Sequence, residues 1–136
     1  RAAHARRGHA ATVTWHSTVA ALPASPAGDQ MYLPETDGRS SGLPEAIDAL
    51  DGKLRYAHAD GARLLCIVTD SCLPNLETVQ RKVTRLHKLG VAVLWVTIPT
   101  GGPITVLDHV THVHADDPDT IGHTIADAAV KALRHA

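Results

Sequence analysis

The sequence contains no phenylalanine, and aromatic residues make up only 3% of its 136 residues. Any hydrophobic core must therefore be built from Val, Leu, Ile and Ala, with Trp15 and Trp95 as the large side chains. Hydrophobic residues still account for 44% of the chain, which is enough to bury a real core. We expect residues 1–136 to form a single domain.

The sequence also lacks an excess of positive or negative charge, and it lacks a long apolar run. The chain has 13 Lys and Arg against 14 Asp and Glu, for a formal net charge of -1. This balance offers no net attraction to polyanions, so we expect no nucleic-acid partner. Because no apolar run approaches the roughly 20 residues that a membrane-spanning helix requires, we expect no membrane span either.

Cysteine is scarce, with two residues at Cys66 and Cys72. Cys66 falls inside an apolar run and Cys72 lies just beyond its end, so the pair is local and badly placed for a structural disulfide. We interpret both residues as thiols, which favours a reducing compartment such as the cytoplasm.

The chain begins with Arg1 rather than Met, and no signal-type apolar stretch follows. Residues 1–8 are rich in Ala and basic residues and end at Gly8, as the last turns of a helix do. We therefore expect a processed product, a trimmed chain or a fragment that something preceded.

Alternating apolar and polar residues predict a strand over 11–17, with a second short strand in 18–22 hairpinned to it. Residues 24–42 are rich in Pro, Gly and Ser and predict a loop. Apolar residues at spacings of three and four then predict a helix from Leu43 to Ala57.

The second half of the chain predicts a parallel α/β arrangement. Continuous apolar runs predict buried strands at 64–69 and 91–98, and a helix between them begins at Pro74-Asn75 and stops at Gly90. Strand, helix and strand form a βαβ unit, whose crossover should be right-handed. A short strand at 110–114 and a helix capped by Asp117-Pro118 complete the expected fold.

Asp70 ends the first of these buried strands. If this strand is covered on both faces, Asp70 lies at the carboxyl edge of the sheet, where open α/β folds bind ligands. A carboxylate flanked by the Thr69 and Ser71 hydroxyls suits Mg²⁺, which takes oxygen ligands and keeps several waters. The alternative role for Asp70 is to cap the following loop or helix.

Three segments carry a resemblance to the von Willebrand factor type A domain family. Residues 40–50, SSGLPEAIDAL, are similar to the family's Gly-Thr-x-Leu-x-x-Ala-Leu helix entrance. Residues 65–71, LCIVTDS, are similar to its strand ending in Thr-Asp-Gly, and residues 89–93, LGVAV, to the start of its next strand. The resemblance implies a Rossmann-like, mostly parallel sheet flanked by helices.

The family builds a metal-ion-dependent adhesion site from an Asp-x-Ser-x-Ser run, a Thr at a helix entrance and a strand-end Asp. By this resemblance Ser41 stands where the Thr belongs and Asp70 where the last Asp belongs, which implies Mg²⁺ as the ion. The alternative role for Ser41 is helix capping. The Asp-x-Ser-x-Ser run is missing from residues 1–136, and its place would be upstream of Arg1.

The strand that precedes this run is central in the family, so the expected sheet lacks its first, middle strand. Open strand edges are costly and adhesive. We expect either that a separate segment supplies the missing strand or that the two flanking strands pair directly.

Other residues carry weaker hypotheses. His109, His112 and His114 are spaced closely enough for a zinc site, although scattered surface histidines are the default interpretation. Gly101-Gly102 alone does not make a phosphate-binding motif.

Three functions remain. The first is a protein-binding module in which a partner's acidic side chain completes the coordination of Mg²⁺ near Asp70. The second is an assembly subunit or scaffold with a decayed metal site. The third is a small Rossmann-like, metal-dependent enzyme acting on phosphate substrates, for which no second acid, base or nucleophile stands at a recognisable spacing.

Overall fold

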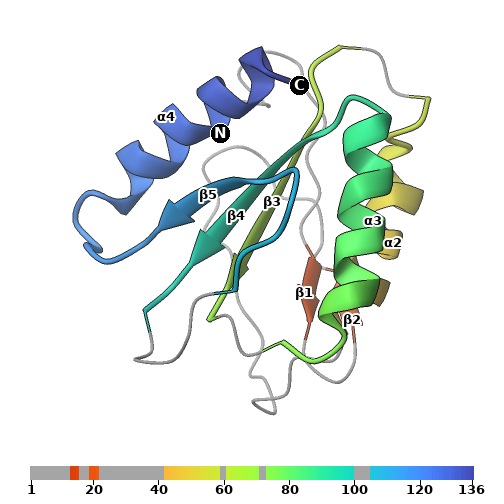
Figure 1. The fold of residues 1–136 in the computed structure, drawn as a ribbon, viewed down its shortest axis with the longest axis horizontal. Helices are drawn as coiled ribbons and strands as arrows, with labels where there is room; N and C mark the ends of the chain where they lie inside the picture. Colours follow the sequence, from red (N-terminus) through yellow and green to blue (C-terminus); the bar gives the residue numbers. More distant parts are fainter. Residues whose placement is uncertain (1–12, 16–18, 22–41, 59–60, 71–72, 100–104) are drawn as a thin grey trace. The chain divides into compact units, whose positions relative to one another are not determined.

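The computed structural model describes residues 13–15, 19–21, 42–58, 61–70, 73–99 and 105–136 (Figure 1). Contacts divide the chain into two compact units, Arg1–Ala59 and Asp60–Ala136. Both units combine helices with strands, which confirms the α/β class expected from the sequence. In the described ranges, no helix is long and apolar enough to cross a membrane.

The first unit contains a β-hairpin and a helix. Strands β1 (Val13–Trp15) and β2 (Val19–Ala21) pair antiparallel, as the alternating pattern predicts. Helix α2 (Leu43–Leu54) contacts both strands and buries the side of the helix that carries Ala46 and Ile47.

Helix α2 ends three residues before the predicted end at Ala57. Arg55 adopts a left-handed conformation with φ 51° and donates its N–H to the carbonyl of Asp51 at 2.7 Å. The helix therefore closes on a left-handed cap that is not glycine, and the apolar spacing that continues to Ala57 misses this stop.

The second unit contains a three-stranded parallel sheet in the order β3-β4-β5 (Figure 1). Helix α3 connects β3 to β4 and helix α4 follows β5, and the two helices lie on opposite faces of the sheet (Figure 1). The predicted βαβ unit is thereby confirmed. The bounds are β3 (Leu64–Thr69), α3 (Leu76–Lys88), β4 (Ala92–Thr97), β5 (Thr111–His114) and α4 (Ile121–Arg134).

The core of this unit is centred on β4. All six residues of β4 are buried, because the strand has a neighbour on each edge and a helix over each face. On one face Leu94, Val96 and Val113 form a buried cluster against α4. Trp95, which is completely buried, points to the other face.

Helix α3 ends in a Schellman motif at Gly90, as the sequence predicts. Gly90 has φ 78°, its N–H bonds the carbonyl of His87 at 2.9 Å, and the N–H of Val91 bonds the carbonyl of Leu86 at 3.1 Å. This tight stop sends the chain straight into β4.

Helix α4 begins at Ile121, after Thr120, and not at Asp117-Pro118 as predicted. The carboxylate of Asp117 instead accepts the N–H of Asp119 at 2.9 Å and shapes the turn that precedes the helix. Asp117 therefore forms a local turn and does not cap the helix.

Candidate functional site at the open edge of β3

Asp70 lies directly after β3, at the carboxyl end of a parallel strand, and its side chain is exposed. The residue before it, Thr69, is buried and pairs with Thr97 of β4. The structure therefore places a carboxylate at the edge of the sheet where the sequence predicts it. Oxygen ligands are those that Mg²⁺ prefers, so Asp70 fits one corner of such a site.

The second predicted ligand, Ser41, lies outside the described residues, as do Ser40, Ser71 and Cys72. Ser41 also belongs to the first unit and Asp70 to the second. The joint coordination of an ion by these two residues therefore stays a prediction. Across the described part of the chain, no group of three or more His, Cys, Asp or Glu is placed to hold a metal ion.

One edge of the β3 backbone pairs with β4, and among the strands that the structure describes none pairs with the other edge, which we call the open edge. The N–H of Ala92 bonds the carbonyl of Arg63, and the N–H of Ile98 bonds that of Thr69, both at 2.9 Å. Because backbone groups alternate between the two edges of a strand, residues 63, 65, 67 and 69 face β4. The backbone groups of Cys66 and Val68 therefore face the opposite edge, where no strand of the described ranges pairs.

The side chains at this edge are also uncovered, which corrects the expectation that β3 is buried on both faces. Leu65 and Ile67 are 2% exposed, but Val68 is 45% exposed and Cys66 is likewise exposed. In the parallel register Cys66 lies beside Leu94 and Val68 beside Val96.

Helix α4 explains this difference between neighbouring strands. It packs over Leu94 and Val96 of β4 and over Val113 of β5, and the partly buried Leu64 of β3 packs against the same cluster. Sequence periodicity could not reveal this, since the composition of β3 is as apolar as that of a covered strand. Desolvation by the surrounding residues raises the pKa of the Cys66 thiol although the residue is exposed.

The described strands form two separate sheets. β1 and β2 make a two-stranded sheet, and β3, β4 and β5 make a three-stranded one. The expected direct pairing of the two flanking strands joins a strand of the first unit to one of the second, and it stays a prediction.

The histidines predicted as zinc candidates bind different partners. His112 Nε2 lies 3.0 Å from the carbonyl oxygen of Thr105, and His114 Nδ1 lies 3.1 Å from the Thr97 hydroxyl. His109, in the turn before β5, stacks on His87 of α3 with ring centroids 4.4 Å apart. The three side chains are thus engaged separately.

Sequence reasoning missed a basic surface on α3. Four of the 13 Lys and Arg fall within this helix, which has one acidic residue, Glu77. The net charge of -1 hides this concentration. The signal that would have found it is the spacing of Arg81, Arg85 and Lys88, which places them on one face of a helix.

Comparisons with models of protein families, with curated proteins and with solved structures found no match.

Proposed function

We propose that this protein is a protein-binding and assembly module of the von Willebrand type A kind, in which an extended polypeptide segment from outside residues 1–136 pairs with the open edge of β3. The open edge at Cys66 and Val68 carries the proposal. Backbone N–H and C=O groups at a free strand edge are a template for another strand. Adding a strand in this way is a recurring mode of peptide recognition.

The chemistry of the edge defines the incoming segment. Its backbone would pair with that of Cys66 and Val68, and its side chains would lie beside theirs on the uncovered face. Apolar, β-branched residues suit such a position, because they bury the exposed part of Val68. Each new backbone hydrogen bond would add about 0.5–1.5 kcal/mol, so a strand of several residues can bind stably.

The family resemblance supports the same arrangement. A strand added beside β3 occupies the position of the family's central first strand, and the Asp-x-Ser-x-Ser run follows that strand. Parallel addition would bring this run to the carboxyl end of β3, where Asp70 lies.

A divalent cation is the second part of the proposal. Asp70 would supply one oxygen ligand to Mg²⁺, Ser41 a hydroxyl, and the incoming run or an acidic side chain of a partner the remaining ligands. Binding of the segment would then depend on Mg²⁺ through Asp70.

Strand addition can be tested with a fluorescent peptide that has the sequence KKTVVVVLDASGS, whose apolar stretch is followed by an Asp-x-Ser-x-Ser run. Fluorescence anisotropy measures its binding to the 1–136 chain. Val68→Pro removes a backbone N–H at the open edge without removing a hydrogen bond to β4, and Val68→Lys adds a charge there. Both variants should weaken binding about tenfold or more, a loss of at least about 1.4 kcal/mol.

Val106→Lys is the matched control, because Val106 is 77% exposed and lies outside the sheet. It should change binding less than about twofold, well under 1 kcal/mol. If the peptide does not bind the folded wild-type chain, or if Val106→Lys weakens binding as much as Val68→Lys, strand addition is wrong.

The metal arm uses the same peptide with and without Mg²⁺. Mg²⁺ should tighten binding, and both Asp70→Ala and a peptide ending in AAAGA should remove this effect. Binding that is unaffected by Mg²⁺ would leave strand addition standing and overturn the metal site.

A further inference from the structure

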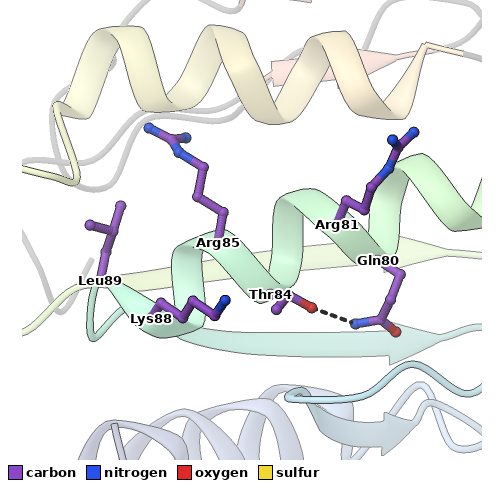
Figure 2. A pocket seen from close by; sticks show the side chains of 6 residues that line it. All are labelled: Gln80, Arg81, Thr84, Arg85, Lys88 and Leu89. Carbon is purple, nitrogen blue, oxygen red and sulfur yellow. Dashed lines mark hydrogen bonds between the residues drawn. The ribbon is translucent and has the colours of Figure 1, made fainter.

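A basic surface lies on helix α3, on the side turned away from the core. Val79, Val83 and Leu86 are completely buried and fix which side of the helix faces the sheet. Arg81, Lys88 and Arg85 are exposed. Arg81 and Arg85 extend from the helix in the same direction (Figure 2).

The cations border a surface hollow of about 470 Å³. Gln80, Thr84 and Leu89 complete its lining. The Gln80 amide is held in place, since its Nε2 donates to the Thr84 hydroxyl at 3.2 Å (Figure 2) and to the carbonyl of Asp108 at 3.1 Å. The hollow therefore has a fixed polar wall, formed by Gln80 and Thr84, beside the long side chains of Arg81, Arg85 and Lys88.

Helix α3 carries more positive than negative charge along its own length. The guanidinium of Arg81 donates to the neutral hydroxyl of Thr78 at 3.3 Å. Lys88 has no ion pair within the described part of the chain. Within helix α3 itself, four basic residues stand against one acid, Glu77.

We infer that this surface, defined by Arg81, Arg85 and Lys88, docks an acidic polypeptide segment. The three cations occupy positions i, i+4 and i+7, which span about 10 Å along the helix axis. Carboxylates spaced over two helical turns of a partner match this distance. The hollow beside the cations receives the partner's side chains, with the Gln80 and Thr84 polar groups at its wall.

The size and surroundings of the surface favour a polypeptide over a nucleic acid. A nucleic-acid interface commonly uses about 6–10 phosphate contacts, whereas this surface offers three cations in one row. The chain as a whole has a net charge of -1, and the exposed Asp116, Asp117 and Asp119 of the same unit would repel a long polyanion. Electrostatic attraction of an acidic partner is therefore confined to the surface of α3.

Binding is tested with a fluorescein-labelled helical peptide that carries Glu at i, i+4 and i+7, and with the same peptide carrying Gln. Anisotropy titrations use the full 1–136 chain at about 50 mM salt, where such contacts are weakly screened. The Glu peptide should bind at least about tenfold more tightly than the Gln peptide, and its binding should weaken as salt rises.

The double variant Arg81→Glu with Lys88→Glu should weaken binding of the Glu peptide about tenfold or more. Lys131→Glu with Arg134→Glu changes the charge equally at exposed positions on α4, and it should have less than about a twofold effect. Circular dichroism should show that both double variants are folded.

Three outcomes would overturn the inference. The first is no binding of the Glu peptide, and the second is an equal loss in the two double variants. The third is tighter binding of a single-stranded oligonucleotide of about 20 nucleotides than of the Glu peptide, which would assign the surface to nucleic acid instead. None of these results bears on strand addition at β3, which involves other residues.

Discussion

The side-chain amide of Gln80 bonds both main-chain groups of Asp108. Its Oε1 accepts the N–H of Asp108 at 2.8 Å, and its Nε2 donates to the carbonyl of the same residue at 3.1 Å. The two residues are 28 positions apart in the chain. Helix α3 thereby fixes the turn that leads into β5, in the way a neighbouring strand would.

Replacing Gln80 by Ala should therefore destabilise the second unit by about 1–2 kcal/mol, since the two hydrogen bonds to Asp108 and the one to Thr84 are lost at a partly solvated position. Chemical denaturation followed by circular dichroism measures this change. Thr84→Ala is the control, because it removes the hydrogen bond between Gln80 and Thr84 and leaves the two Gln80–Asp108 hydrogen bonds in place. Equal stability of Gln80→Ala and wild type would show that the Asp108 contact contributes nothing.

Tyr56 should make stability fall at alkaline pH. Its side chain is 4% exposed, and desolvation, with a smaller contribution from the Asp51 charge, raises its pKa from 10.0 to about 12. Between these two values the unfolded chain ionises at Tyr56 and the folded chain does not. The full contribution is present below pH 10, and about 2–3 kcal/mol is lost as pH rises to 12.

Denaturation of the wild type and of Tyr56→Phe between pH 9 and 12 tests this, because the variant has no hydroxyl to ionise. The difference in stability between the two proteins should shift in favour of Tyr56→Phe by about 1.4 kcal/mol per pH unit at most. A difference that is constant with pH would contradict the raised pKa.

Cys66 should react slowly for an exposed thiol. Because its pKa is raised by desolvation, a smaller fraction is thiolate near neutral pH, and the thiolate is the nucleophile. In a Cys72→Ser background, alkylation by iodoacetamide at pH 8 should be slower than that of an unstructured cysteine peptide. Denaturant should abolish the difference.

The same thiol reports on strand addition. Cys66 lies at the open edge of β3, so a strand paired there should cover it and slow alkylation further. The KKTVVVVLDASGS peptide should protect Cys66 in wild type and not in Val68→Pro. Protection that persists in Val68→Pro would place the peptide elsewhere.

Trp95→Phe should cost little despite the complete burial of Trp95. Its Nε1 is buried and has no hydrogen-bond partner in the described part of the chain. Removing an unsatisfied buried donor recovers about 1–3 kcal/mol. This gain offsets the loss of packing, so the free energy of unfolding should change by about 1 kcal/mol or less.

Trp95→Ala is the comparison, since it removes both the donor and the whole ring and should cost about 3–5 kcal/mol. Thermal and urea denaturation measure both variants. A large destabilisation by Trp95→Phe would mean that the indole N–H is satisfied in solution.

Local sequence was sufficient for the second unit's framework. Val79, Val83 and Leu86 recur at helical spacing, and Gly90 supplies the left-handed residue that ends the helix. The apolar runs at β3 and β4 predicted strands in both places. Helix ends were predicted less well, because Arg55 and Asp117 act through local backbone geometry that apolar spacing does not encode.

The sequence likewise predicted only part of the candidate site. The sequence predicted Asp70 at a sheet edge, because the end of an apolar run is visible in the letters. The exposure of the Cys66 and Val68 side chains was not visible, since β3 and β4 have similar composition. Burial of a strand depends on which elements cover it, and here α4 covers β4 and β5.

The basic surface on α3 shows the same limit. The sequence by itself determined that Arg81, Arg85 and Lys88 lie on one helix face, because helical periodicity is local. Only the tertiary structure decided that this face is exposed and that Gln80 and Thr84 form a hollow beside it. Exposure is set by contacts between residues far apart in the chain, such as Gln80 and Asp108, and these contacts arise only when the elements pack.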